Sequence, residues 1–350
     1  MSMEIIVGLP HLNRGPILER VQELRAPALI SANCLSIWSR RNGWPNWGGW
    51  RLDKLKNARG LHSLCLDSAG FVATANYGGF PWSIGQYVAL AAAFPFRWWA
   101  SIDYCTEAEI AGDRDEVLDR ISRTIRANLD SWRMGCDAGI GGTFLPVIQG
   151  RAPADYERCA DGISACIQSG RLIGVGSMCR REIHGPEGLI AVVDHLDRLL
   201  PPGIRLHLFG VKGSAIPFLL PFRHRIASLD SQAYGVTARR DAYRRGAVKT
   251  DGLVADHLEQ WLRVQYRRRR EPPRNLPMQA APAPPCGPSN RWEAAIALAR
   301  QEIRELIETG NLEHDEVTLP WVEQWAADIY RDGPIADNTT SGLRVPPNAT

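Results

Sequence analysis

Short apolar runs alternate with amphipathic stretches through the first 230 residues of the chain. Eight of these runs have the length and the nearly continuous apolar content of strands that are buried on both faces. They span residues 4–8, 28–34, 62–66, 98–102, 143–148, 172–175, 205–209 and 226–229. Strands of this kind are covered by helices, so the pattern predicts an α/β fold.

Helical periodicity fills the stretches between the apolar runs. Pro16 begins one such stretch, in which Ile17, Val21 and Leu24 share one face. Further helical patterns span residues 107–132, 153–169, 186–200 and 213–221. Eight strands that alternate with helices predict a (β/α)8 barrel of the TIM type, and a doubly wound open sheet is the alternative.

The pattern changes after Asp230, and the chain divides by composition into five parts. The expected parts are a catalytic barrel (1–235), a basic helical segment (236–270), a proline-rich linker (271–288), a C-terminal helical pair (289–335) and a disordered tail (336–350). In the helical pair, Ser289 or Asn290 is expected to cap the first helix, and Pro320 to begin the second. The predicted fold is therefore a barrel with an arginine-rich helical extension.

Charge and cysteine content narrow the class of protein. All but four of the 41 basic residues are arginine, which reflects either a GC-rich genome or contact with phosphate groups. No apolar stretch approaches the roughly 20 residues of a membrane span, and the first residues do not resemble a secretory leader. The eight cysteines form no CxxC pair and are expected to be reduced. We therefore expect a cytoplasmic protein without membrane contact.

Polar residues follow the predicted strands at the point where each strand ends. Asp67, Asp103 and Asp230 each come directly after an apolar run. In a parallel barrel these ends converge on one face, which is where such enzymes build their active sites. An aspartate after a strand is also a common helix cap or turn former, and Asp67 fits a cap well. With the amide of Gln149 and the glycines that follow other strands, the three acids form a set that could hold a flat, purine-like heterocycle by its hydrogen-bonding edge.

The ordered set of strand-end motifs resembles the tRNA-guanine transglycosylase superfamily. The motifs are Asp67-Ser-Ala-Gly-Phe, Ile102-Asp103-Tyr-Cys105, Val147-Ile-Gln149-Gly150, Ile173-Gly-Val-Gly176-Ser, Leu208-Phe-Gly210-Val211 and Ser228-Leu-Asp230. The opening Val7-Gly-Leu-Pro-His11 and the segment Ile30-Ser-Ala-Asn33 look more like the DpdA branch, the deazapurine DNA modification proteins of phages and bacterial islands. That branch is implied to exchange guanine in DNA for a 7-deazaguanine base.

The resemblance implies a role for each matched residue. Asp230 matches the nucleophile, and Asp67 matches the general acid and base. The residues that match the base-binding set are Asp103, Cys105, Gln149, Gly150, Gly176 and Ser177. DNA and a 7-deazaguanine base, such as 7-cyano-7-deazaguanine, are the implied substrates, with no cofactor. The reaction would be that of a pentosyltransferase that passes through a covalent aspartyl-deoxyribose intermediate.

The chain departs from the tRNA enzymes in its C-terminal part. Those enzymes carry a zinc site there, whereas only Cys286, His257 and His314 follow Asp230 in this sequence, so we expect no metal. Arginines occupy the place instead and are predicted to bind nucleic acid: Arg239, Arg240, Arg244, Arg245, Arg267, Arg268, Arg269 and Arg270. The alternatives are a tRNA-guanine transglycosylase, a non-catalytic nucleic-acid-binding barrel and a barrel hydrolase that acts on sugars. The oligomeric state stays open.

Overall fold

The computed structural model describes residues 3–41, 44–108, 111–167, 171–275, 288 and 290–332. The chain forms two compact units, residues 1–280 and residues 281–350. The division falls within the stretch predicted as a proline-rich linker. Most of that stretch, and the whole of the predicted tail at 336–350, lie outside the described residues.

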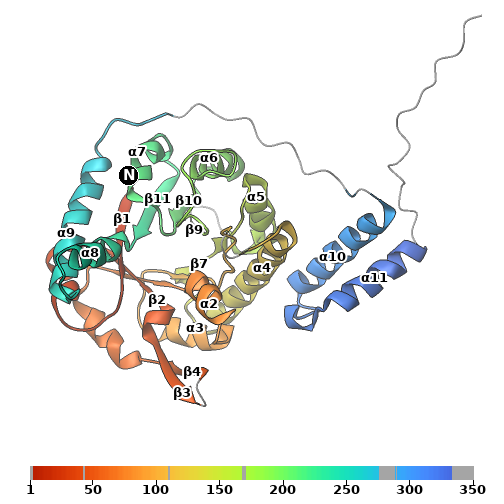
Figure 1. The fold of residues 1–350 in the computed structure, drawn as a ribbon, viewed down its shortest axis with the longest axis horizontal. Coiled ribbons are helices and arrows are strands. Elements are labelled where there is room, and N and C mark those ends of the chain that lie inside the picture. Colours follow the sequence, from red (N-terminus) through yellow and green to blue (C-terminus); the bar gives the residue numbers. More distant parts are fainter. Residues whose placement is uncertain are drawn as a thin grey trace, which may run out of the picture. The chain divides into compact units, whose positions relative to one another are not determined.

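A parallel sheet of nine strands forms the centre of the first unit within the described residues (Figure 1). The strands are β1 (Glu4–Leu9), β2 (Ala28–Ser31), β5 (Leu64–Asp67), β6 (Trp99–Ala100), β7 (Phe144–Leu145), β8 (Val147–Ile148), β9 (Leu172–Val175), β10 (Arg205–Leu208) and β11 (Ile226–Ser231). Their order is β7-β6-β5-β2-β1-β11-β10-β9-β8. Only Pro146 separates the two edge strands β7 and β8, so the sheet closes almost completely on itself. The prediction of a TIM-type barrel is confirmed.

The barrel closes through a joint at Pro146. Proline has no N–H to donate, so the strand is interrupted there, while its carbonyl oxygen still accepts from Gly174 N at 2.8 Å. The side-chain amide of Asn128 pairs with the next residue. Asn128 Oδ1 accepts from Val147 N and Asn128 Nδ2 donates to Val147 O, both at 2.9 Å. A buried side chain thus supplies hydrogen bonds that a neighbouring strand would otherwise give.

Helices surround the sheet (Figure 1). In the sequence, each of them lies between two strands of the sheet. They are α1 (Pro16–Glu23), α2 (Gly70–Tyr77), α3 (Ile84–Ala92), α4 (Arg114–Asp137), α5 (Pro153–Gly162), α6 (Leu189–Leu199) and the short α7 (Ile216–Leu219). Helix α1 begins at Pro16, as predicted, and buries Ile17 and Val21. Helices α2 and α3 were not predicted.

The predicted basic segment forms two helices that pack on the barrel. Helix α8 (Ala233–Arg244) starts directly after β11, and α9 (Asp251–Arg268) returns beside it. Tyr234 joins them to the barrel, because its hydroxyl donates to Gly8 O at 2.6 Å and its ring lies 5.8 Å from that of Trp261. Both helices belong to the same compact unit as the sheet.

One apolar run in the sequence does not form a single strand. The predicted strand 28–34 ends at Ser31, and a 3-10 helix, η1 (Ala32–Leu35), continues it. Ala32 and Leu35 are as buried as strand residues, so their apolar character does not distinguish the two structures. An antiparallel hairpin that was not predicted follows, formed by β3 (Ser36–Arg41) and β4 (Trp44–Trp50).

Apolar side chains fill the inside of the barrel. The inner cluster consists of Ile6, Leu29, Cys65, Trp98, Ala100, Leu145 and Val147. His207 is fully buried, with its ring 4.8 Å from that of Trp98 and 4.5 Å from that of Phe209. The barrel is therefore a packed core with functional space only at its ends.

The second unit contains two helices, α10 (Arg291–Thr309) and α11 (Leu319–Asp332). Asn290 caps α10 by accepting from Glu293 N at 2.9 Å, and Pro320 lies at the start of α11 as expected. Ala295, Ala299 and Ala326 are buried where the two helices pack together. Among the described residues, no helix has the length and apolar character needed to cross a membrane.

The joint at Pro146 yields a test of how the barrel closes. Replacing Asn128 with alanine leaves the buried Val147 N–H and C=O without these partners, which costs about 2–4 kcal/mol of the free energy of unfolding. The exposed Met134→Ala on the same helix is the control, with an expected change below about 0.5 kcal/mol. Urea denaturation followed by circular dichroism measures both. Equal midpoints for the two variants would show that the joint contributes nothing.

Candidate functional site

A pocket of about 160 Å³ opens where several barrel strands end, and we call it the acid pocket. Its lining contains seven of the eight residues predicted for catalysis and base binding: Asp67, Asp103, Cys105, Gln149, Gly176, Ser177 and Asp230. Asp67 is the last residue of β5, and Asp230 lies next to the end of β11. The volume suits one ring system, since an apolar cavity of about 150 Å³ accommodates benzene.

A chain of hydrogen bonds joins Asp103 to Gln149 and Ser177. Ser68 Oγ donates to Asp103 Oδ1 at 2.6 Å, and Gln149 Nε2 donates to Asp103 Oδ2 at 2.5 Å. Ser177 Oγ in turn lies 2.6 Å from Gln149 Oε1 and accepts from Thr106 N at 2.8 Å. Burial raises the pKa of Asp103 to about 6, although the bonds from Ser68 and Gln149 oppose that rise. The result is a fixed, polar edge on one wall of the pocket.

Asp67 has a different environment from Asp103. The backbone N–H of Ala69 donates to Asp67 Oδ2 at 3.1 Å. Burial raises the pKa of Asp67 to about 7, and the negative charges of Asp103 and Asp230 act in the same direction, while Ala69 and Ser31 oppose the rise. A carboxyl group with a pKa near neutrality can both donate and accept a proton at physiological pH.

Asp230 is held by the neighbouring strand. Gly210 N donates to Asp230 Oδ1 at 2.9 Å, and His207 Nε2 lies 3.3 Å from the same oxygen. The other ring nitrogen of His207 lies 2.8 Å from Ser228 Oγ, which fixes the orientation of the imidazole. His207 is fully buried and packed, and it also contacts this aspartate.

Glycine is required at two positions around the pocket. A Cβ atom on Gly176 would overlap the side-chain amide of Gln149, so only glycine leaves room for it. Gly210 has φ +68, a left-handed conformation that other residues rarely adopt. Gly150 does not line the pocket: its carbonyl oxygen accepts from Arg181 Nη2, and a Cβ there would meet Tyr156 on α5. The structure thus places Gly150 behind the wall.

Several lining residues were not predicted as part of the site. Glu107 is a buried carboxylate whose Oε2 lies 3.1 Å from Ser177 Oγ. Phe71, Met178 and Phe209 add apolar surface to the same pocket. Phe71 and Phe209 occur within the motifs named in the sequence analysis, next to the ends of strands. That position could have indicated that both residues line the pocket. Glu107 follows the β6 strand by seven residues, and nothing in its spacing distinguishes it from a surface acid.

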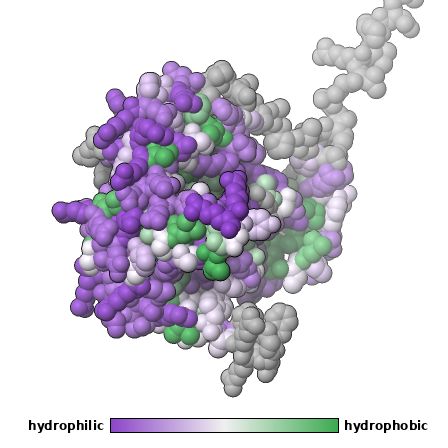
Figure 2. All heavy atoms as spheres, turned by 60° about the vertical axis from the view of Figure 1, so that its left-hand side comes forward, coloured by the Kyte–Doolittle hydropathy of each residue, from purple (hydrophilic) through white to green (hydrophobic). Residues whose placement is uncertain are grey.

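The predicted nucleic-acid-binding arginines form two separate groups. Arg239, Arg240 and Arg244 are exposed on α8, where Tyr243 beside them is 87% exposed. Arg245, at the end of α8, pairs with Asp241. The second group lies at the end of α9: Arg267, Arg268, Arg269 and Arg270. Figure 2 brings this side of the barrel forward and shows a largely hydrophilic surface with small hydrophobic patches.

The α9 group lies at the opposite end of the barrel from the acid pocket. Arg269 Nη1 donates to Met3 O at 2.8 Å, and Met3 precedes the first residue of β1. Arg268 Nη1 donates to Gln265 Oε1 at 3.1 Å. The eight arginines therefore do not form one surface beside the predicted catalytic residues.

The described residues contain no group of three or more histidine, cysteine, aspartate or glutamate side chains arranged to hold a metal ion. The acid pocket instead offers carboxylates, an amide and apolar surface. This arrangement, at the C-terminal ends of parallel strands, defines the class of an α/β-barrel enzyme.

Comparison with known families identifies the chain more closely. A family model described as DpdA, deoxypurine in DNA protein A, matches residues 34–297, and the chain belongs to this family. It is thus a deazapurine DNA modification protein with DNA as its substrate. No curated protein matches the sequence.

The close approach of Gly176 to Gln149 provides a test of the pocket wall. Gly176→Ala places a Cβ on the amide, so Gln149 must leave Asp103, and we expect a loss of about 2–3 kcal/mol in the free energy of unfolding. Gly142→Ala is the matched control, because no atom lies within 4 Å of its Cβ position. Thermal unfolding of both variants measures the difference, and an equally stable Gly176→Ala protein would contradict the expected clash.

Proposed function

We propose that the protein is a DNA guanine transglycosylase that exchanges guanine in DNA for a 7-deazaguanine base. The observation that carries the proposal is the acid pocket, in which two carboxylates with different surroundings, Asp67 and Asp230, share a space the size of one base with a fixed polar edge. Membership in a DNA-modifying family supports the same conclusion. Glycosyl transfer characteristically uses a pair of carboxylates for its acid–base and nucleophilic steps.

The Asp103 edge supplies the base recognition in this proposal. An ionised Asp103 accepts hydrogen bonds from the N1–H and the 2-amino group of guanine, while Ser68 and Gln149 hold the carboxylate in place. A 7-deazaguanine has the same hydrogen-bonding edge, because it differs from guanine only at position 7. One pocket therefore holds the leaving base and the incoming base in turn, as an exchange reaction requires.

Asp230 and Asp67 divide the chemistry. The Asp230 carboxylate attacks C1′ of the target deoxyguanosine, the bond from C1′ to N9 breaks, and Asp67 gives its proton to the departing guanine. Asp67, now ionised, takes the N9 proton from the incoming deazaguanine, whose nitrogen attacks C1′ and displaces Asp230. Two displacements at the same carbon retain its configuration. Gly210 and His207 hold Asp230 in one orientation for both steps.

The exposed face of α8 is the proposed contact with the DNA backbone near the acid pocket. Helix α8 begins three residues after Asp230, and its rise of about 1.5 Å per residue places Arg244 about 17 Å along it. Arg239 and Arg240 lie on the same exposed face as Tyr243, which offers a ring for stacking on a base. The target base must leave the duplex for C1′ to reach Asp230.

Replacement of the nucleophile tests the reaction. Asp230→Asn keeps the size of the side chain but removes the attacking charge, so we expect incorporation of labelled 7-cyano-7-deazaguanine into duplex DNA to fall by at least about 10³-fold. A covalent protein–DNA adduct on a denaturing gel should also disappear. Asp53→Asn, which removes an exposed acid, is the control. Undiminished incorporation by Asp230→Asn would overturn the nucleophile assignment, and incorporation into tRNA alone would overturn DNA as the substrate of the exchange.

The pKa of Asp67 leads to a pH prediction. Guanine release needs the protonated form, which is present below a pKa of about 7 and is lost above it, so the single-turnover rate of release should fall as the pH rises through about 7. Asp103→Asn removes one of the negative charges that raise this pKa, so the fall should move to lower pH. The control variant Asp53→Asn should leave the midpoint of this fall at the wild-type pH. A midpoint that does not move in Asp103→Asn would contradict the role of Asp67.

A further inference from the structure

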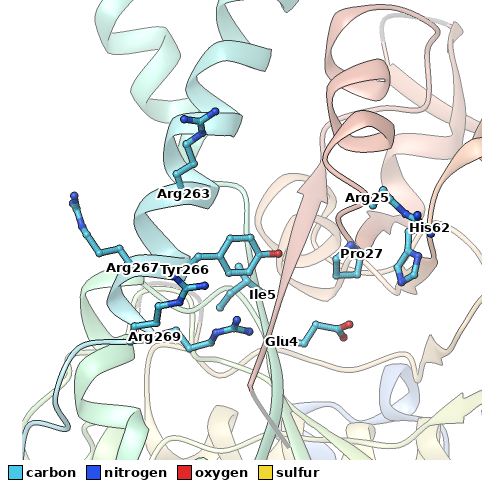
Figure 3. A pocket seen from close by; sticks show the side chains of 10 residues that line it. Glu4, Ile5, Arg25, Pro27, His62, Arg263, Tyr266, Arg267 and Arg269 are labelled. Carbon is cyan, nitrogen blue, oxygen red and sulfur yellow. The ribbon is translucent and has the colours of Figure 1, made fainter.

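A second pocket lies at the N-terminal end of the barrel, and we call it the basic pocket (Figure 3). Its volume is about 650 Å³, which is in the range of sites for small-molecule ligands and larger than the acid pocket. It is lined by Glu4, Ile5, Arg25, Pro27, His62, Arg263, Tyr266, Arg267, Arg269 and Arg270. Nothing in the proposed exchange reaction uses it.

Strand positions place the two pockets at opposite ends of the barrel. Pro27 directly precedes β2 and His62 lies just before β5, so the basic pocket is at the N-terminal ends of these strands. Asp67, in the acid pocket, is the last residue of β5. At about 3.3 Å per residue, His62 and Asp67 are separated by about 17 Å along the chain. A nucleotide in the acid pocket therefore cannot also occupy the basic pocket.

The charge of the basic pocket is strongly unbalanced. Five of its lining residues are arginines, and its one carboxylate, Glu4, is engaged by Arg97 outside the lining at 2.6 Å. Within the described part of the chain, Arg25, Arg267 and Arg270 form no ion pair. Side chains of this kind, gathered without carboxylate partners, create a positive potential that attracts anions. Arginine also presents the fork of donors that matches a phosphate group.

Two residues hold the wall of the basic pocket in position. Arg269 bonds to Met3 O, and its guanidinium carbon lies 5.1 Å from the centre of the Tyr266 ring. Figure 3 shows Tyr266 on α9 and Arg269, just past the end of that helix, facing Glu4, with Arg25 and His62 across the opening. The pocket therefore lies between the end of α9 and the loops that lead into β2 and β5.

The arginines at and near the end of α9 are spread along the pocket and are not clustered at one place. Arg263 and Arg267 lie four residues apart on α9, and Arg270 follows three residues later, just past the end of the helix, so the three span about 10 Å along the pocket. Arg263 also pairs with Glu259, whereas the other two form no ion pair among the described residues. Phosphates along one strand of a duplex advance about 3.4 Å each along its axis, so a row of this length spans about two to three of them. We propose that the basic pocket is a second phosphate-binding site, which takes a phosphodiester segment of nucleic acid other than the one that carries the target nucleotide.

A salt titration of DNA binding tests the proposal. The triple variant Arg25→Gln/Arg267→Gln/Arg270→Gln removes the three arginines that have no ion-pair partner among the described residues. We expect its affinity for a long fluorescent duplex at about 100 mM salt to fall about tenfold or more, and the slope of log affinity against log salt to fall by about two. The control triple variant Arg133→Gln/Arg171→Gln/Arg198→Gln removes three exposed arginines elsewhere on the barrel and should change neither quantity beyond a small effect of net charge. Matching thermal midpoints establish that both variants are folded.

Two further experiments are needed. One distinguishes nucleic acid from a small phosphate ester as the ligand, and the other distinguishes this proposal from the proposed exchange reaction. If pyrophosphate binds to the wild type and not to the triple variant, as measured by calorimetry, while DNA affinity is unchanged, the site is a phosphate site for small esters rather than for nucleic acid, and the proposal is overturned. If neither ligand distinguishes the triple variant from the control, the proposal is overturned as well. Base exchange on a short single-stranded substrate should be equal in the triple variant and the wild type, so a failure of the proposed reaction is recognised independently.

Discussion

Four carboxylates line one small pocket, those of Asp67, Asp103, Glu107 and Asp230, and each has a different set of hydrogen-bond partners. Burial penalises every ionised group, and neighbouring negative charges add to that penalty. Asp103 receives two side-chain donors, from Ser68 and Gln149, and Asp230 receives a backbone N–H beside His207. Asp67 receives a backbone N–H from Ala69, and burial, together with the negative charges of Asp103 and Asp230, raises its pKa to about 7. Asp67, Asp103 and Asp230 are the same residue type, but the fold gives each of them different hydrogen-bond partners.

The hydrogen bond that Asp103 receives from Gln149 depends in turn on the closure of the barrel. Asp103 follows β6, which pairs with β7, and Gln149 follows β8, which Pro146 alone separates from β7 in the sequence. Asn128 clamps Val147, two residues before Gln149, and so fixes the strand from which the amide projects. A side chain on an outer helix therefore controls the geometry of the polar edge. Gly176 completes this wall by leaving room for the amide.

The sequence was sufficient to predict the barrel and most of the pocket. Buried parallel strands are continuous apolar runs, and an acid at the end of such a run is conspicuous, so β5 and β11 with Asp67 and Asp230 could be recognised. The hairpin β3–β4 could not, because its tryptophans and glycines are not typical of a strand that covers a core. Glu107 was missed for a related reason: it comes from a loop, and only the folded chain shows that the loop turns back to Ser177.

The arginines show why a run of charge in a sequence does not define a surface. Those of α8 and those at the end of α9 belong to one basic segment, but α9 has 18 residues and is therefore about 27 Å long. The helix begins near the end of the barrel where β1 ends, since Asp251 lies 3.4 Å from His11, and it ends beside Met3, where β1 begins. The basic segment that follows β11 thus carries about half of its positive charge to the far end of the barrel. A straight duplex over the acid pocket would contact the arginines of α8 without reaching those at the end of α9, so the two groups cannot act as one binding surface for it.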